Sequence, residues 1–256
     1  MKKLNITAMI FVIGFCAISL SCVIFSMRGD GRLISTEKTV SQFEKISIAS
    51  GAEVRFHASP NYRVVVTIDS NLYEYVDIFT LNRVLNIRTE HGNYSPTRFQ
   101  VDVYSPALSG VSVSGSGSFT AMDRIVMSSF ESIVSGSGTI EGTIESGDFS
   151  ARISGSGKIK NNVTCDNLTA NISGAGEITI TGTGRDSDIR ISGSGDFNGI
   201  EFKTNNASAR ISGSGNMNIW AMDYLQANIS GSGSVRYRGT PRIDFSGSGS
   251  GRIRAE

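Results

Sequence analysis

Cysteine, proline and histidine are scarce, with three, four and two copies among 256 residues. Few cysteines and histidines are therefore available for disulfides or metal sites. Cys16 and Cys22 lie in an apolar N-terminal segment, so the body of the chain keeps only Cys165, which has no partner for an intrachain disulfide. We interpret Cys165 as a small core or turn residue. His57 and His91 are far from it in sequence, so we expect no zinc site, no histidine-assisted nucleophile and no cofactor.

A strong net charge is also absent. Twenty-four basic and 23 acidic side chains leave a net charge of +1. Nucleic-acid binding depends on a basic surface that neutralises phosphates, so we expect no nucleic-acid partner.

Residues 1–25 have the pattern of an export signal or membrane anchor. Lys2 and Lys3 precede a mostly apolar stretch, residues 4–20, that carries no charge. The segment Ser19-Leu20-Ser21-Cys22 resembles the lipobox of bacterial lipoproteins, in which the cysteine is lipidated, although Ser19 stands where leucine is usual. The alternative is an uncleaved transmembrane helix, because apolar character continues through residue 25. Both readings predict an extracytoplasmic protein tethered to a membrane of the bacterial envelope.

Glycine, in contrast, is abundant, with 29 copies, and its placement shows an internal repeat. The motif Ser-Gly-Ser-Gly, or Ser-Gly-Ala-Gly, occurs eight times at steps of 16–21 residues. Steps of this size are typical of the coils of a solenoid. The first glycines of the eight copies, which we expect to be structural turn residues, are Gly115, Gly136, Gly155, Gly174, Gly193, Gly213, Gly231 and Gly247.

The residues around each turn alternate with a period of two, which indicates β-strands. In residues 151–159, for example, small or apolar side chains alternate with polar ones. A row of larger side chains, Phe130, Phe149, Leu168 and Leu225, would fill a narrow shared core. The glycines would let the backbone bend close to this core, where a Cβ would clash. We therefore predict an all-β fold, a β-solenoid or parallel β-helix with about eight coils over residues 111–256.

Residues 35–110 lack the repeat but contain five strand-like runs, so we expect irregular coils that cap the N-terminal end of the solenoid. Residues 26–34 are expected to be a linker. Residues 71–76 are expected to form one helical turn.

The strand series that begins at Phe43, the Ser105-Pro106-Ala107-Leu108 connection and the Ser-Gly-Ser-Gly turns together resemble a bacterial family known as putative auto-transporter adhesin, head GIN domain. The resemblance covers about residues 43–236. It implies a β-helical protein of the cell envelope, and it brings no catalytic or ligand residues with it.

One outward-facing column of side chains has functional promise, namely Arg152, Asn171, Arg190, Arg210 and Asn228. The simplest interpretation is a solvated face. The sharper hypothesis is that Arg190 and Arg210 help to bind an acidic sugar or another anionic component of the envelope or host. The position after each turn holds Lys158, Glu177, Asp196 and Asn216 in successive coils.

Two classes of function stay open. The first, which the repeats favour, is a non-enzymatic adhesion, binding or structural module whose partner is an envelope or host glycan or protein. The second is a β-helix enzyme or binder that acts on acidic polysaccharide, with Asp186, Asp188 and Asp196 as candidate carboxylates. No turn has the Lys-Ser/Thr pair of a phosphate-binding loop or the aspartate spacing of a calcium-binding repeat.

Overall fold

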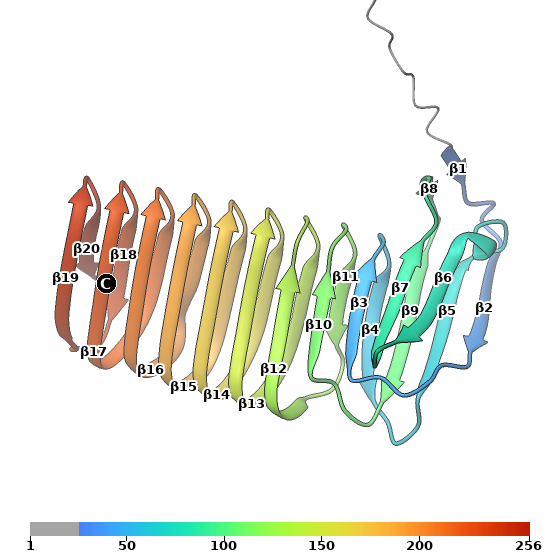
Figure 1. Cartoon of the computed structure of the whole chain (residues 1–256), viewed down its shortest axis with the longest axis horizontal. Helices are drawn as coiled ribbons and strands as arrows, with labels where there is room; N and C mark the ends of the chain where they lie inside the picture. The colour runs from blue at the N-terminus through green and yellow to red at the C-terminus, as the bar shows by residue number, and fades with distance from the viewer. Residues whose placement is uncertain (1–25) are drawn as a thin grey trace, which may run out of the picture.

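The computed structural model describes residues 26–256, and in this part of the chain almost all regular structure is β-strand (Figure 1). The 3₁₀ turn η1, Tyr73–Tyr75, lies within the segment expected to be helical. None of the helical structure in residues 26–256 has the length and apolar character needed to span a membrane. The strands are β1 (Ser26–Arg28), β2 (Leu33–Lys38), β3 (Lys45–Ala49), β4 (Glu53–Ala58), β5 (Arg63–Asp69), β6 (Val76–Leu81), β7 (Val84–Thr89), β8 (Asn93–Ser95), β9 (Phe99–Ser105), β10 (Gly110–Val113), β11 (Ser118–Ala121), β12 (Ile125–Val134), β13 (Thr139–Gly155), β14 (Lys158–Gly174), β15 (Glu177–Gly193), β16 (Asp196–Gly213), β17 (Asn216–Gly231), β18 (Ser234–Arg238), β19 (Arg242–Gly249) and β20 (Arg252–Ala255).

Each long strand bends in its middle, so one coil contributes to two layers. In β13, Ile140 and Ile144 are buried at even positions, whereas Phe149 and Ile153 are buried at odd positions. The alternation of inward and outward side chains shifts by one residue at Gly147, which has no partner in the pairing of β13 with β14. We call the half-strands that run into the Ser-Gly-Ser-Gly turn the pre-turn layer, and those that leave the turn the post-turn layer. The predicted β-solenoid is confirmed, and it has two layers.

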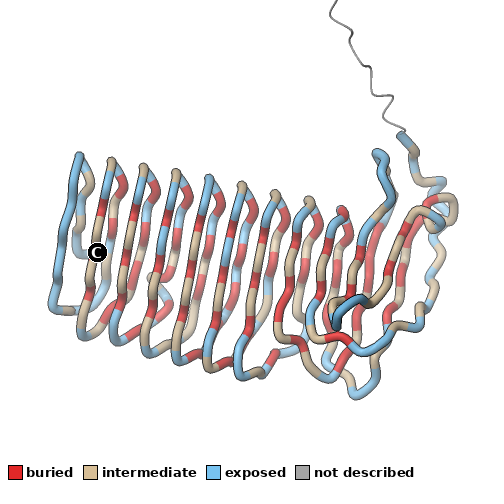
Figure 2. The backbone as a smooth tube through the Cα atoms, in the orientation of Figure 1, coloured by how far each residue is buried: buried red, intermediate tan, exposed pale blue. Residues whose placement is uncertain are grey.

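Successive coils pair in parallel and in register, which stacks identical positions into columns. Ile153 pairs with Ile172, and Ile172 pairs with Ile191. All three are about 2% exposed, so the column forms part of a continuous core between the layers (Figure 2). The predicted row of Phe130, Phe149, Leu168 and Leu225 is buried as well.

One coil is short of core side chains, and its neighbour compensates. β15 places Gly182, Gly184 and Ser187 at inward positions where other coils carry larger residues. Phe202 of β16, 2% exposed, lies against this gap, because a Cβ built on Gly184 would come within 2.5 Å of its ring. A single phenylalanine thus replaces core volume that the preceding coil lacks.

The turn glycines are required sterically. Gly155, Gly174, Gly193, Gly213 and Gly231 all have φ between 120° and 133°, a region that residues with a Cβ rarely adopt. A Cβ on Gly193 would also lie 2.6 Å from the carbonyl oxygen of Gly174 in the preceding coil. Gly115 and Gly136 are not among the glycines with positive φ, but a Cβ there would again meet backbone, at 2.8 and 2.6 Å.

The last predicted turn glycine needs correction. Gly247 pairs with Ile229 and therefore occupies an inward strand position. Gly249, with φ of 97°, pairs with Gly231 and is the turn residue of that coil. The inward-facing Phe245, which pairs with Ala227, sets this register.

Residues before the repeats close the N-terminal end. β3 and β4 form one more coil, flanked on one side by β10 and β11 and on the other by β7 and β9. Outside these, β6 pairs antiparallel with β7, and β5 pairs antiparallel with β9 and β2. Residues 26–34, expected to be a linker, include β1, which pairs with β8, and the start of β2.

A buried carboxylate fastens this end. Asp69, 0% exposed, accepts hydrogen bonds from the backbone N–H groups of Gly31, at 2.8 Å, and Thr97, at 2.7 Å. Burial acts to raise the pKa of Asp69, but hydrogen bonds from Thr97, Gly31 and Arg98 outweigh it and hold the pKa below its ordinary value. The ionised carboxylate therefore joins the segment before β2 to the segment before β9.

Candidate functional site

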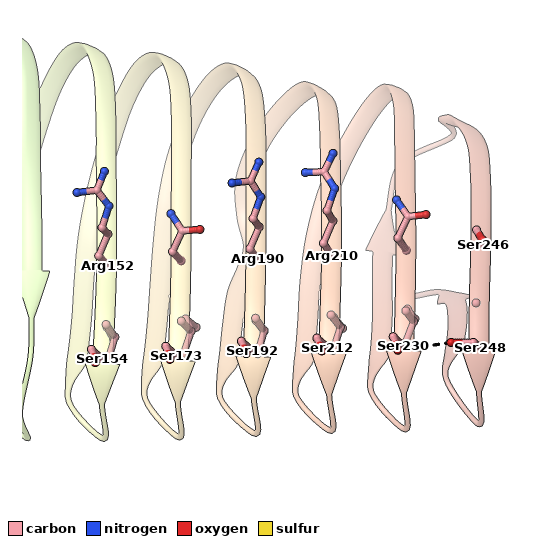
Figure 3. Close-up of a pocket in the computed structure, with 18 of the residues that line it drawn as sticks. Arg152, Ser154, Ser173, Arg190, Ser192, Arg210, Ser212, Ser230, Ser246 and Ser248 are labelled. Carbon is pink, nitrogen blue, oxygen red and sulfur yellow. Dashed lines mark hydrogen bonds between the residues drawn. The ribbon is translucent and has the colours of Figure 1, made fainter.

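The pre-turn layer places the predicted arginine and asparagine positions in one outward column. Arg152 pairs with Asn171, Asn171 with Arg190, Arg190 with Arg210, and Arg210 with Asn228. Neighbours in this column are about 4.8 Å apart, the usual distance between paired strands. Two residues further along each strand runs a parallel column of serines, namely Ser154, Ser173, Ser192, Ser212, Ser230 and Ser248 (Figure 3).

A groove of about 810 Å³ lies along these two columns. The floor of the groove includes the backbone of Ile153, Ile172 and Ile191. The side chains of these residues are buried in the core on the other side of the layer. At one end, Ile133 replaces arginine in the outer column, and at the other end Ser246 does so. The serine column was not predicted as part of a site, although the repeat itself places these serines on the same face as the arginines.

Two carboxylates in the column two positions before the arginines engage them: Asp188 lies on the same strand as Arg190, and Glu131 lies one coil before Arg152. Arg190 Nη2 lies 2.5 Å from Asp188 Oδ2, and Arg210 Nη1 lies 2.9 Å from Asp188 Oδ1. Arg152 Nη1 lies 2.5 Å from Glu131 Oε1. Lys45 Nζ also lies 3.3 Å from Glu131 Oε2, so four cations surround two carboxylates and leave two positive charges. Each guanidinium has further N–H donors available to a ligand.

The candidate catalytic carboxylates are each engaged by arginine or asparagine side chains. Asp186 accepts hydrogen bonds from Asn206 at 2.8 Å and Arg185 at 2.9 Å, which lower its pKa in that order. Asp188 binds the two arginines, as described. Asp196 lies across the turn in the post-turn layer, where Asn216 donates a hydrogen bond to it at 2.9 Å. Asp186 and Asp188 thus lie two residues apart on the outward side of β15, each bound to arginine, whereas Asp196 lies in the other layer.

The post-turn column behaves as a solvated face. Lys158 and Glu177, in neighbouring coils, form an ion pair at 3.1 Å, and both side chains are about half exposed. Asn216 receives a further hydrogen bond from Ser234 at 2.7 Å. Opposite charges and amides thus satisfy one another from coil to coil.

The remaining candidate groups are structural in their surroundings. Burial, followed by the nearby Asp166 and Asp148, raises the pKa of Cys165 to about 12, so its thiol is protonated at neutral pH. His57 Nε2 lies 3.3 Å from Asp102 Oδ1, and the imidazole ring stacks on the ring of Tyr104. The sequence predicted neither contact. Across residues 26–256, no cluster of three or more His, Cys, Asp or Glu side chains could hold a metal ion. Cys22, the predicted lipidation site, lies outside the described residues.

Most of the sequence matches a known protein family. Residues 42–241 match the model of the family described as putative auto-transporter adhesin, head GIN domain. The chain belongs to this family. Membership of this adhesin family indicates an extracellular or cell-envelope protein. No curated protein matches the chain.

Solved structures share the solenoid over nearly their whole length. A putative lipid binding protein from Parabacteroides distasonis superposes with a TM-score of 0.86 and 27% identity, covering 90% of this chain and 99% of that protein. A putative adhesin from Parabacteroides merdae superposes with a TM-score of 0.86 and 24% identity, covering 91% of this chain and 99% of that protein. A putative adhesin from Bacteroides fragilis superposes with a TM-score of 0.68 and 18% identity, covering 90% of this chain and 100% of that protein. The last two similarities show the shared fold alone.

Proposed function

We propose that this member of the head GIN family is a non-enzymatic binding module of the cell envelope, and that its groove holds an extended anionic glycan of the envelope or of a host surface. One observation carries the proposal: Arg or Asn, followed two residues later by Ser, recurs in five consecutive coils along one groove. A polymer with a repeated acidic group could meet a similar set of donors at each coil.

Binding fits this surface better than catalysis does. A catalytic site needs a few dissimilar groups that converge and exclude water, whereas this groove is open and repeats one set of groups. Repeated weak contacts can still add up to useful affinity, because each later contact is made at a high effective concentration. We propose attachment to the membrane through a lipid on Cys22, with a transmembrane helix in residues 1–25 as the alternative.

The test is binding of polygalacturonate, an acidic polysaccharide, to residues 26–256, a piece that contains the whole core described for residues 43–235. Isothermal titration calorimetry should show that Arg190→Ala combined with Arg210→Ala weakens binding about tenfold or more, since two guanidiniums are lost and Asp188 is left uncompensated. Added salt should weaken binding by the parent protein, because exposed charges are screened over about 8–10 Å.

The matched control is Lys158→Ala combined with Lys160→Ala, which removes two exposed cations from the post-turn layer and should leave binding unchanged. Asp188→Asn should strengthen binding, because it releases Arg190 and Arg210 from their shared carboxylate. Equal weakening by both double variants would reject the groove. Binding to vesicles of anionic lipid in place of polygalacturonate would reject the glycan, and new unsaturated or reducing ends would reject the non-enzymatic assignment.

A further inference from the structure

The post-turn layer carries its charge unevenly, and its last coils are basic. In residues 216–256 the outward positions of the post-turn half-strands hold one carboxylate side chain, Glu256, and four arginines, namely Arg236, Arg238, Arg252 and Arg254. These groups leave a charge of +3 on this part of the face, whereas the whole chain has a net charge of +1. We call the four arginines, together with Lys203 and Trp220, the basic patch. Figure 1 shows β18 and β20 in the layer behind β19, so the patch and the groove lie on opposite faces of the solenoid.

Two of these arginines stand opposite each other without a counter-charge. Arg236 pairs with Arg254 on the neighbouring strand, about 4.8 Å away, and its other neighbour in the column is Asn218. Neither arginine makes an ion pair or a side-chain hydrogen bond within residues 26–256. Like charges directly opposite each other destabilise a sheet, and elsewhere on this layer Lys158 faces Glu177. An arginine pair in this position indicates an anion that is not part of the fold.

A bulge places the single tryptophan of the chain beside this pair. Beyond Gly199, three residues of β16 have no partner in β17, and the pairing resumes with Lys203 opposite Trp220. Without the bulge, Ile200 would be the neighbour of Trp220 on this side. Arg238 pairs with Trp220 on the other side. Because bulges often re-aim side chains at functional sites, the departure from the repeat marks this face as more than a solvated surface.

The two neighbours of Trp220 each place a cation over its ring. Arg238 Cζ lies 4.7 Å and Lys203 Nζ lies 5.8 Å from a ring centroid of Trp220. A guanidinium that packs against a ring keeps N–H donors in its own plane for an anion. A sugar ring could stack on Trp220 only by displacing one of these cations. The arrangement therefore favours a partner that meets cationic and aromatic groups side by side.

We propose that the basic patch lies against a membrane surface that contains anionic phospholipid, a proposal that rests on the membrane attachment included in the proposed function. Side chains that point outward from one sheet lie side by side and do not converge, so they fit a plane of phosphate groups better than one small anion. Arginine forms paired hydrogen bonds with phosphate, and tryptophan is enriched at the level of the headgroups. Each arginine near such a surface adds to the electrostatic attraction.

This contact sets the orientation of the groove. The pre-turn and post-turn layers have their outer faces on opposite sides of the solenoid. A molecule that rests on the basic patch therefore turns the column of Arg190 and Arg210 away from the membrane. The groove stays open to a glycan while the protein lies flat.

Binding of residues 26–256 to vesicles tests the proposal without the N-terminal segment. At low salt, vesicles of equal parts phosphatidylcholine and phosphatidylglycerol should bind the protein at least about tenfold more tightly than vesicles of phosphatidylcholine alone. Because Trp220 is the only tryptophan, its fluorescence reports on the patch alone, and its emission should move to shorter wavelength on binding. Polygalacturonate, which is expected in the groove, should leave this emission unchanged.

Two matched variants separate the faces. Arg236→Gln combined with Arg254→Gln should weaken binding to the anionic vesicles about tenfold or more and leave binding of polygalacturonate unchanged. Both side chains are exposed and repel each other, so the variant should fold as the parent does. The control, Arg190→Gln combined with Arg210→Gln, removes the same charge from the opposite face and should show the reverse pattern.

The absence of a preference for anionic vesicles would overturn the proposal, as would equal weakening of vesicle binding by the two double variants. A shift of Trp220 emission with polygalacturonate but not with vesicles would also overturn it, because this face would then bind glycan. Vesicle binding that requires Arg236 and Arg254, in a protein that does not bind polygalacturonate, would support the membrane contact and reject the glycan in the groove.

Discussion

At the scale of single residues, the turn glycines show how directly one backbone position follows from the repeat. The sequence predicted seven of them correctly, because a Ser-Gly-Ser-Gly motif flanked by alternating apolar residues has one sensible alignment. It failed at Gly247, because residues 246–251 contain three Ser-Gly pairs in succession and two alignments place a glycine at the turn. Only the pairing of Phe245 with Ala227 decides between them.

Gly193→Ala should lower the stability of the protein by about 1–3 kcal/mol, because the substitution is strained at φ of 126° and its Cβ would approach the carbonyl oxygen of Gly174 to 2.6 Å. Thermal unfolding followed by circular dichroism measures the effect. Gly51→Ala is the matched control, since a Cβ there would meet only Ser116 Oγ, at an ordinary 3.6 Å. Equal losses of stability in both variants would contradict the steric explanation.

At the scale of the coil, the sequence predicted the inward rows but not the number of layers. The bend falls at positions equivalent to Gly147, Asp166 and Arg185, which the ladders skip in successive coils. These three residues have no chemistry in common, so the bend has no signature that a single sequence can reveal. The one-residue change of phase becomes visible only when the burial of both halves is known.

Phe202→Ala should destabilise the solenoid by about 3–5 kcal/mol, more than a typical core truncation, because Gly182 and Gly184 have no side chains with which to fill the cavity. Chemical denaturation gives the free energy of unfolding. Val126→Ala, at a position 61% exposed in β12, should change it by less than about 0.5 kcal/mol. A loss below about 1 kcal/mol for Phe202→Ala would show that the neighbouring coils collapse into the space.

At the scale of the whole molecule, the arginine and asparagine column was predictable, because equal spacing along the chain becomes stacking in space. The way in which its charge is balanced was not. Asp188 binds an arginine of its own strand and another one coil away, and Arg152 binds Glu131 of the preceding coil. Such pairs depend on the exact register between coils.

Deletion of residues 158–176, a complete coil of 19 residues, should leave a folded solenoid, because Thr139, Lys158 and Glu177 occupy one column and the new junction restores it. We expect the β-type circular dichroism spectrum to persist, with a melting temperature lower by about 5–10 °C. Deletion of residues 158–166, which removes only a post-turn half, should abolish cooperative unfolding. Cooperative unfolding in both deletions would contradict the stacking in register.

The position of the β3–β4 coil has a consequence for the order in which the chain folds. This coil lies between β7 and β9, which follow it in sequence, and β10 and β11, which come later still. Its two flanks are completed only when residues up to about 121 have left the ribosome or the export channel. Every later coil has its neighbour already formed and can add one at a time, with contacts that span only about 19 residues. Folding should therefore have one slow, nonlocal step at the N-terminal end, followed by fast growth from that seed toward the C-terminus.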